Sequence, residues 1–517
     1  METEVTITLR HSGIACLLAI VFLAGSGCTS SNTVAQAVPS GPVTLSIGLP
    51  VQTGAAPLHG ATQAARLVTL EGLSYLARDG RPHPRLAQSW TESSDGLTWT
   101  IRLRPNAFFH DGSPVDAQSV KASLERSRNS ADRDLSPGLA DIVAIETPTP
   151  HEVLIRVQNR STFLLDDLGV PITKRNAAGG AIGTGPFVTT STSDGEVVMT
   201  AVSNYYRGRP KADRVTLKSY PTVRTAWAAM MRGEVDFLYE VGPEVVEFVQ
   251  GESSLTVFRF LRNYAYGVIL NSSHREFANP EVRRALNYAI DRPALVRRAF
   301  REHGVAATGP GWPEHWAFDA GVTSLSYDPV RAVALLDSAK ISVSASDVGA
   351  PSRFRFTCLL PENFALWERI GLLVQRNLAQ VGVDMQLQAI PVGEFNRRIG
   401  AGDFDAVLTD FIVGNSPTRP YFFWHSKSRL NTWRYNNPKV DDALDRIRHA
   451  SNETEYRDAF RDFQLHTLDD PPAIFLALGE TSRAVSKRFR VIAPPGTDIF
   501  PTIADWQLGG DVGGTAR

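Results

Sequence analysis

Two segments far apart in the sequence share one pattern, in which a helix-like stretch ends at a glycine and is followed by an acidic residue, any residue, an aspartate and an apolar strand. The first covers residues 233–240 and the second residues 402–408. Glycine often ends an α-helix in the left-handed conformation, so each segment predicts a turn from helix to strand. The first strand leads into a loop at residues 241–243, and the second leads into a loop that carries polar and aromatic residues. Ligands of open α/β sheets bind at strand ends. The pair predicts an α/β chain whose two lobes face a shared cleft; the alternative is two ordinary turns without a binding role.

The length and the net charge of the chain limit the classes of protein to which it can belong. A chain of 517 residues exceeds one ordinary domain, so we expect two or three hydrophobic cores. The hydrophobic content of 43% and the charged content of 21% are those of a soluble globular protein. The formal net charge is −1 and the basic residues form no run, so no overall field favours nucleic acid or an anionic membrane. We therefore expect no nucleic-acid partner.

The first 41 residues predict export. Residues 14–24 form an apolar run that is too short to span a bilayer but has the length of a signal-peptide core. Small residues lead from this run to Cys28, and a tether rich in Ser, Thr and Asn occupies residues 29–41. The arrangement resembles a bacterial lipoprotein signal, which predicts that residues 1–28 are a signal peptide ending at a lipidated Cys28. The alternative is a cleaved signal without lipid.

Only one cysteine, Cys358, lies beyond this signal. It belongs to residues 354–360, in which the even positions share one face of a strand. A lone cysteine between phenylalanines and leucines is typical of a buried core position, where sulfur packs as an apolar atom. We expect Cys358 to be a core residue rather than a nucleophile.

Residues 79–126 predict a β-rich subdomain with a short helix. Asp95 and Gly96 form a hairpin-turn signal, and it leads into a strand. The positions that share one face of that strand are Leu97, Trp99, Ile101 and Leu103. Asp116 is suited to cap a helix that begins directly after it.

This region also resembles the signature of a known family, the extracytoplasmic solute-binding proteins, family 5, of oligopeptide, dipeptide and nickel ABC transporters. The matching motifs are PRLAQSW (84–90), SDGLTWTIRLR (94–104), FFHDGSPVDA (108–117), GTGPF (183–187), NYY (204–206), VRRALNYAIDR (282–292), YDPVRA (327–332) and YNNPKVD (435–441). The resemblance covers roughly residues 43–505. Most of these motifs are structural: they supply turns and helix caps, and they identify the fold rather than the ligand.

The resemblance implies a two-lobed α/β fold like that of periplasmic binding proteins, type II, of the large class with an extra subdomain in lobe I. The implied layout is lobe I over residues 42–261 with an inserted subdomain at about 86–170, lobe II over 262–470, a return to lobe I over 471–508 and a flexible tail over 509–517. The crossings near residues 263–266 and 471–475 would then be the hinge. Ligand that bridges both lobes would favour the closed state.

The implied function is the substrate-binding component of an ABC importer, which captures a peptide or other small polar solute and delivers it to membrane permease subunits. The resemblance implies a monomer outside the cytoplasm, held to the membrane by the lipid at its N-terminus. We expect no cofactor, no metal site and no catalysis. Two other function classes remain: an exported ligand sensor or chaperone-like binding protein without transport, and a hydrolase. The hydrolase is disfavoured because the sequence contains no HExxH, GxSxG, GxxxxGK or CxxC motif.

Histidines offer little support for metal binding, because they are not at metal-ligand spacings. Glu302 with His303, and Glu314 with His315, are adjacent pairs whose side chains would point apart on a helix. We expect both pairs at the surface.

The candidate ligand-binding residues follow the two strand ends and the first hinge crossing. They are Tyr239, Tyr264, Tyr266, Asp410, Phe411, Asn415, Arg419 and Trp424. In peptide binders of the family, an aspartate in the loop that matches residues 411–420 pairs with the free amine of the peptide. Gly414 occupies that position here, with Asp410 as the alternative amine partner, and Arg419 favours an anion. The aromatic residues have an alternative role in the core.

Overall fold

The computed structural model describes residues 41–51, 57–130, 136–193, 195–242, 246–343 and 351–509. The expected signal peptide, Cys28 and most of the expected tether lie outside the described residues, as does nearly all of the expected tail. Among the helices of the described residues, none is both long enough and apolar enough to cross a membrane.

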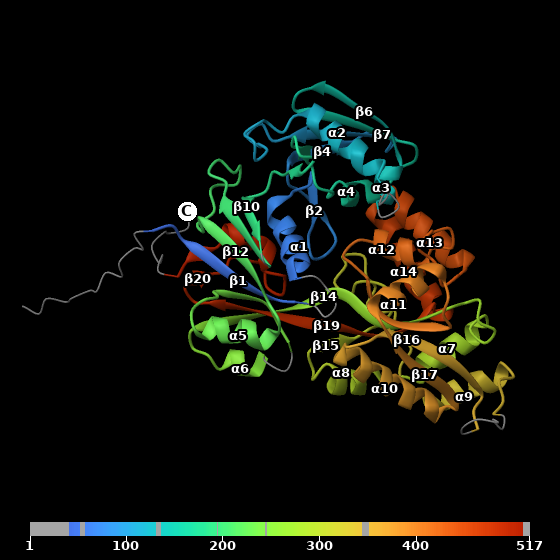
Figure 1. Cartoon of the computed structure of the whole chain (residues 1–517). Helices are drawn as coiled ribbons and strands as arrows, with labels where there is room; N and C mark the ends of the chain where they lie inside the picture. The colour runs from blue at the N-terminus through green and yellow to red at the C-terminus, as the bar shows by residue number, and fades with distance from the viewer. Residues whose placement is uncertain are drawn as a thin grey trace, which may run out of the picture. The chain divides into compact units, whose positions relative to one another are not determined.

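A mixed sheet of 11 strands forms the centre of the fold (Figure 1). Its order is β10-β11-β12-β1-β13-β19-β14-β18-β16-β17, and β15 pairs with β19. The strands are β1 (Thr44–Pro50), β10 (Phe187–Ser193), β11 (Glu196–Ala201), β12 (Arg214–Tyr220), β13 (Phe237–Val241), β14 (Leu255–Leu270), β15 (Gly304–Ala306), β16 (Phe354–Pro361), β17 (Val383–Ile390), β18 (Ala406–Ile412) and β19 (Ala473–Ser486).

The two long strands β14 and β19 join the halves of this sheet. They pair antiparallel, and their register shifts between the pairs Leu261↔Glu480 and Ala265↔Leu478. Strands β1, β12 and β13 lie on one side of this shift and β16, β17 and β18 on the other. We call the described residues 41–261 and 480–509 the first lobe, and the described residues 262–479 the second lobe. On β19 this shift lies at residues 478–480.

Helices cover the sheet in both lobes. In the first lobe these are α1 (Pro57–Thr69), α5 (Val223–Met231), α6 (Val246–Gln250) and the 3₁₀ helix η2 (Phe500–Asp505). In the second lobe they are α7 (Pro280–Tyr288), α8 (Arg292–Ala299), α9 (Pro329–Ser338), α10 (Ala365–Gln380), α11 (Val392–Ala401), α12 (Thr418–Trp424), α13 (Pro438–His449) and α14 (Glu453–Asp469). The short strand pairs are β2 (Ser74–Leu76) with β3 (Pro82–Pro84), β8 (Lys174–Arg175) with β9 (Ala181–Ile182), and β20 (Phe489–Arg490) with β21 (Gln507–Leu508).

A separate four-stranded sheet forms a subdomain of the first lobe, drawn in blue to teal in Figure 1. Its elements are β4 (Ala87–Glu92), β5 (Thr98–Leu103), β6 (Ile142–Thr149), β7 (Glu152–Val157), α2 (Ala117–Arg128), α3 (Pro137–Ala140) and α4 (Phe163–Asp167). Trp99, Ile101 and Leu103 are buried on one face of β5, as their alternation predicted. Leu97 precedes the strand and stays exposed. Asp116 caps α2 through a hydrogen bond from the Ser119 amide, as predicted.

The two glycine turns that predicted the α/β architecture are present. Gly233 and Gly402 adopt φ values of +73° and +69°, and each follows a helix and precedes a strand of the central sheet. Cys358 is fully buried and free, in agreement with a core role. The loop expected after β18 is shorter than predicted, because Thr418–Trp424 forms helix α12. Trp424 belongs to the second-lobe core and Tyr421 and Phe423 pack against it, and that burial favours a helix over an open loop.

Candidate functional site

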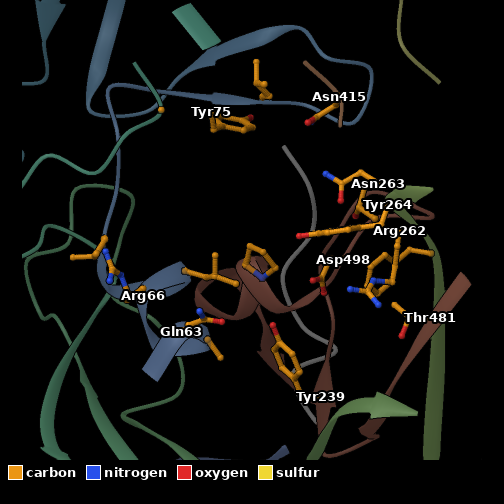
Figure 2. A pocket seen from close by; sticks show the side chains of 18 of the residues that line it. Gln63, Arg66, Tyr75, Tyr239, Arg262, Asn263, Tyr264, Asn415, Thr481 and Asp498 are labelled. Carbon is orange, nitrogen blue, oxygen red and sulfur yellow. The ribbon is translucent and has the colours of Figure 1, made fainter. Parts of the chain in front are cut away.

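A cavity of about 1260 Å³ lies between the two lobes (Figure 2). This volume exceeds the range of about 300–1,000 Å³ that is usual for small-molecule sites, so the cavity has room for a short peptide. Side chains from both lobes line it. The first lobe contributes α1, residues 70–85, the end of β13 and residues 497–501, and the second lobe contributes residues 262–264, Trp312, Asn415 and Arg419.

Six arginines line the cavity: Arg66, Arg78, Arg85, Arg262, Arg419 and Arg483. Three of these are neutralised by acidic partners. Arg78 pairs with Glu314, Arg85 Nε lies 3.3 Å from Glu71 Oε1, and Arg483 Nη2 lies 2.7 Å from Asp498 Oδ2.

The other three arginines form no ion pair or side-chain hydrogen bond with any described residue. Arg262 lies with its guanidinium carbon 5.0 Å from the centre of the Tyr264 ring, and Arg419 lies 5.5 Å from the Phe422 ring. Figure 2 shows Arg66 on α1 and Arg262 on β14 at opposite walls of the cavity. Guanidinium groups bind carboxylates through paired hydrogen bonds, so the cavity offers free donors to an anion on more than one wall.

Two acids of α4 stand beside one of these arginines. Burial raises the pKa of Asp166 to about 7, although the Ser416 hydroxyl donates to it and the Arg419 charge acts in the opposite direction. Burial also raises the pKa of Asp167 well above its usual range, and the Gly138 amide donates to this carboxyl at 2.6 Å. A raised pKa favours the neutral form of a carboxyl, so both acids compensate the Arg419 charge less than ordinary aspartates would.

Residues 81–432 match the family "Bacterial extracellular solute-binding proteins, family 5 Middle". The chain belongs to this family. Its predicted fold and its role as the solute-binding component of an ABC import system are thereby confirmed, as is its location outside the cytoplasm.

The relatives agree with membership in family 5. The chain is 28% identical to the glutathione-binding protein GsiB of Pectobacterium atrosepticum over 447 residues, which is 81% of this chain and 84% of that protein. It is 27% identical to GsiB of Escherichia coli strain K12 over 451 residues, with 82% and 86% covered. These relatives are binding proteins rather than enzymes.

The solved structures show the same two-lobed fold. NikZ from Campylobacter jejuni, in complex with Ni(L-His), has a TM-score of 0.78 at 23% identity, with 90% of this chain and 99% of that chain covered. The oligopeptide-binding protein AppA from Bacillus subtilis, in complex with a nonapeptide, has a TM-score of 0.75 at 20% identity, with 90% and 100% covered.

Of the eight candidate ligand-binding residues of this family 5 protein, four line the cavity: Tyr239, Tyr264, Asn415 and Arg419. Tyr239 lies near the end of β13, Tyr264 at the register shift of β14, Asn415 after β18 and Arg419 in α12.

The other four lie away from the cavity surface. Phe411 and Trp424 are 3% and 1% exposed and meet edge to face, with ring centres 5.5 Å apart, in the second-lobe core. Tyr266 packs against Phe300 and pairs across the sheet with Asp410, whose pKa is raised by burial. Tyr266 lies two residues deeper in β14 than Tyr264, Asp410 and Phe411 lie inside β18, and Trp424 is the last residue of α12. The period of a strand does not show where its buried part ends.

Several cavity residues carry no sequence motif. Arg66 lies on α1, and its helix was not among the predicted site elements. Arg262 and Asn263 precede the predicted Tyr264 and could have been found from that hinge crossing. Asp166 comes from the subdomain, about 250 residues before its partner Ser416.

One histidine differs clearly from its expected position. His315 was expected at the surface of a helix, but it lies in a loop and is 5% exposed. Its ring stacks on Phe460 of α14, with ring centres 4.8 Å apart. The prediction was wrong because residues 312–316 fold onto the aromatic face of α14. No group of three or more His, Cys, Asp or Glu in the described part of the chain could hold a metal ion.

Proposed function

We propose that the cavity binds a small acidic solute, and that short acidic peptides of the charge type of glutathione are its ligand class. The observation that carries this proposal is the set of three arginines, Arg66, Arg262 and Arg419, that line the cavity without an ion pair or a side-chain hydrogen bond among the described residues. Guanidinium groups bind carboxylates through charge-assisted hydrogen bonds, so a ligand that brings carboxylates to these arginines gains those interactions.

The acidic residues of the cavity support the same ligand class. Glu71 and Asp498 are paired with arginines, and Asp166 and Asp167 have raised pKa values. Glu240 lines the cavity and forms no ion pair or side-chain hydrogen bond among the described residues. The charged groups of the cavity that form no ion pair or side-chain hydrogen bond among the described residues are therefore three arginines and Glu240, and two further acids have raised pKa values. Such a set suits a ligand with carboxylates in excess of ammonium groups, and Glu240 is a candidate amine partner in place of the residue missing at Gly414.

The relatives provide the first probe. The GsiB proteins are named for glutathione, a tripeptide with two carboxylates and one ammonium group at neutral pH. Calorimetry should compare glutathione, a neutral tripeptide such as Gly-Gly-Gly and a basic tripeptide on the mature chain. We expect the affinity to fall in that order. Equal affinity for the three, or a preference for the basic peptide, would reject an acidic ligand class.

We further propose that the protein is anchored through a lipid on Cys28, after removal of residues 1–27 and with residues 29–41 as a tether. The apolar run at residues 14–24 and the small residues before Cys28 support this proposal. Membrane fractionation of the wild type and Cys28→Ala should show the variant in the soluble extracytoplasmic fraction. Equally firm membrane attachment of both proteins would contradict the anchor.

The lobe boundaries, the hinge and the monomeric state belong to the same proposal. The register shift between β14 and β19 supports a hinge at about residues 261–265 and 478–480. Small-angle scattering should give the mass of a monomer and a smaller radius of gyration in saturating glutathione. An unchanged radius with proven binding would contradict closure about this hinge.

A further inference from the structure

The tip of the β2–β3 hairpin inserts into the second lobe. Three consecutive carbonyl oxygens of this tip accept hydrogen bonds from second-lobe groups. Asn415 Nδ2 donates to Ala77 O at 2.6 Å, Trp312 Nε1 donates to Arg78 O at 2.9 Å, and the Trp316 amide donates to Asp79 O at 2.9 Å. We call residues 77–81 the hairpin tip. We call the second-lobe residues that contact it, Trp312, His315, Trp316 and Asn415, the socket.

Gly80 fits into this socket because it has no side chain. Its φ of +84° lies in the left-handed region, which glycine adopts without strain. A Cβ at this position would lie 2.2 Å from Asn415 O and 2.5 Å from His315 Cδ2, and both contacts are far shorter than van der Waals separation. The backbone of the first lobe therefore packs directly on the buried His315 ring.

The socket is itself fixed by packing. The His315 ring lies parallel to the Phe460 ring and within 5.9 Å of the Tyr456 ring. Its Nδ1 accepts a hydrogen bond from the Ala317 amide at 3.1 Å. The rim of the socket adds charge pairs: Arg81 Nη1 lies 2.7 Å from Glu453 Oε1, and Arg78 pairs with Glu314.

The same hairpin forms part of the cavity wall. Tyr75 and Arg78 line the cavity from the hairpin, and Trp312 and Asn415 line it from the socket. Docking of the tip therefore completes the wall around a bound solute, while Gly80 and His315 hold the tip from outside the cavity.

We propose that the β2–β3 hairpin is a latch that holds the two lobes closed, so that the affinity for solute depends on residues that do not touch the solute. The proposal rests on the capture of a solute in the cavity, as proposed above. Gly80 and His315 are positioning residues in this account.

The chain offers a matched pair of substitutions to test the latch. Gly80→Ala introduces the clashing Cβ at φ +84°. Gly112→Ala introduces a Cβ at φ +81°, where no heavy atom lies within 4 Å. Both variants carry similar backbone strain, so a difference between them reports on the socket.

Hydrogen exchange of the mature chain without solute tests docking directly, because the Trp316 amide is bonded to the hairpin tip. We expect residues 312–318 to exchange at least tenfold faster in Gly80→Ala than in the wild type and Gly112→Ala. Equal exchange in all three proteins would overturn the latch. This readout does not depend on the identity of the solute.

Glutathione titrations then test the link to affinity. We expect Gly80→Ala to bind glutathione about tenfold more weakly than Gly112→Ala, mainly through faster dissociation. Faster exchange in Gly80→Ala with unchanged glutathione affinity would overturn the claim that the latch sets affinity. Failure of the wild type to bind glutathione would count against the proposed ligand class, whereas the exchange result would still decide whether the latch docks.

Discussion

Two of the contacts between the lobes are built from different chemistry. The first is the hairpin tip in its socket, where backbone carbonyls, a glycine and stacked rings make the interface. The second joins the subdomain to α12 and α13, which lie next to it in Figure 1. There, Thr162 donates through its amide to Arg448 O at 2.8 Å and through its hydroxyl to Ile447 O at 2.9 Å, and Arg448 Nη2 lies 2.5 Å from Asp141 Oδ1.

Because their chemistry differs, the two contacts respond differently to pH. The socket depends on shape and on a neutral His315, and burial lowers the pKa of this histidine to about 4. The subdomain contact depends on ionisable groups, among them Asp166, which burial favours in its protonated form. The socket should therefore weaken as pH falls, and the subdomain contact should weaken as pH rises.

The largest effect is expected at the ion pair of the subdomain contact. Arg448→Ala leaves the nearly buried Asp141 without its partner, so we expect the free energy of unfolding to fall by about 3–5 kcal/mol. Arg446→Ala is the control on the same helix, because its exposed pairs with Asp442 and Asp462 should cost about 1 kcal/mol or less. Urea unfolding of both variants measures the comparison, and similar losses would show that the Arg448 pair is an ordinary surface contact.

A pH-dependent effect is expected from Asp166. Its pKa is about 7 in the folded protein and about 3.8 when exposed, so ionisation disfavours the folded contact increasingly as pH rises from about 4 to 7. Asp166→Asn keeps an acceptor for Ser416 and removes the titration. We expect this variant to be more stable than the wild type at pH 8, by about 1–4 kcal/mol, and the gain to shrink towards pH 5. A gain that does not change between pH 5 and 8 would contradict this origin.

A smaller effect of opposite sign is expected from His315. Its pKa is lowered from about 6.5 to about 4, so its packing is fully favourable above pH 6.5 and is lost as pH falls towards 4. Asp79 acts to raise this pKa, and Arg81 and Arg457 act to lower it. His315→Phe keeps an aromatic ring and removes the titration. We expect the free energy of unfolding of the variant, relative to that of the wild type, to rise by about 1–3 kcal/mol between pH 7.5 and pH 5, as measured by thermal unfolding. A difference that stays constant with pH would exclude titration of His315 as the cause.

Sequence patterns predicted the parts of the molecule that local physics decides. The alternation around Trp99 and the cap at Asp116 needed only strand period and side-chain geometry. The contacts that build the site could not be predicted from local patterns, because they join segments hundreds of residues apart. Arg66 lies in an ordinary helix, and neither the socket for Gly80 nor the burial of His315 has a local signal.

The central claim is that free arginines of the cavity hold the acidic groups of the solute, and calorimetry with glutathione on Arg419→Ala tests it most directly. Arg397→Ala is the control, since this arginine lies exposed on α11 away from the cavity. We predict that Arg419→Ala loses about 1.5–3 kcal/mol of binding free energy, as for a charged hydrogen bond, while Arg397→Ala binds like the wild type. Equal glutathione affinity in the wild type and Arg419→Ala would contradict the account.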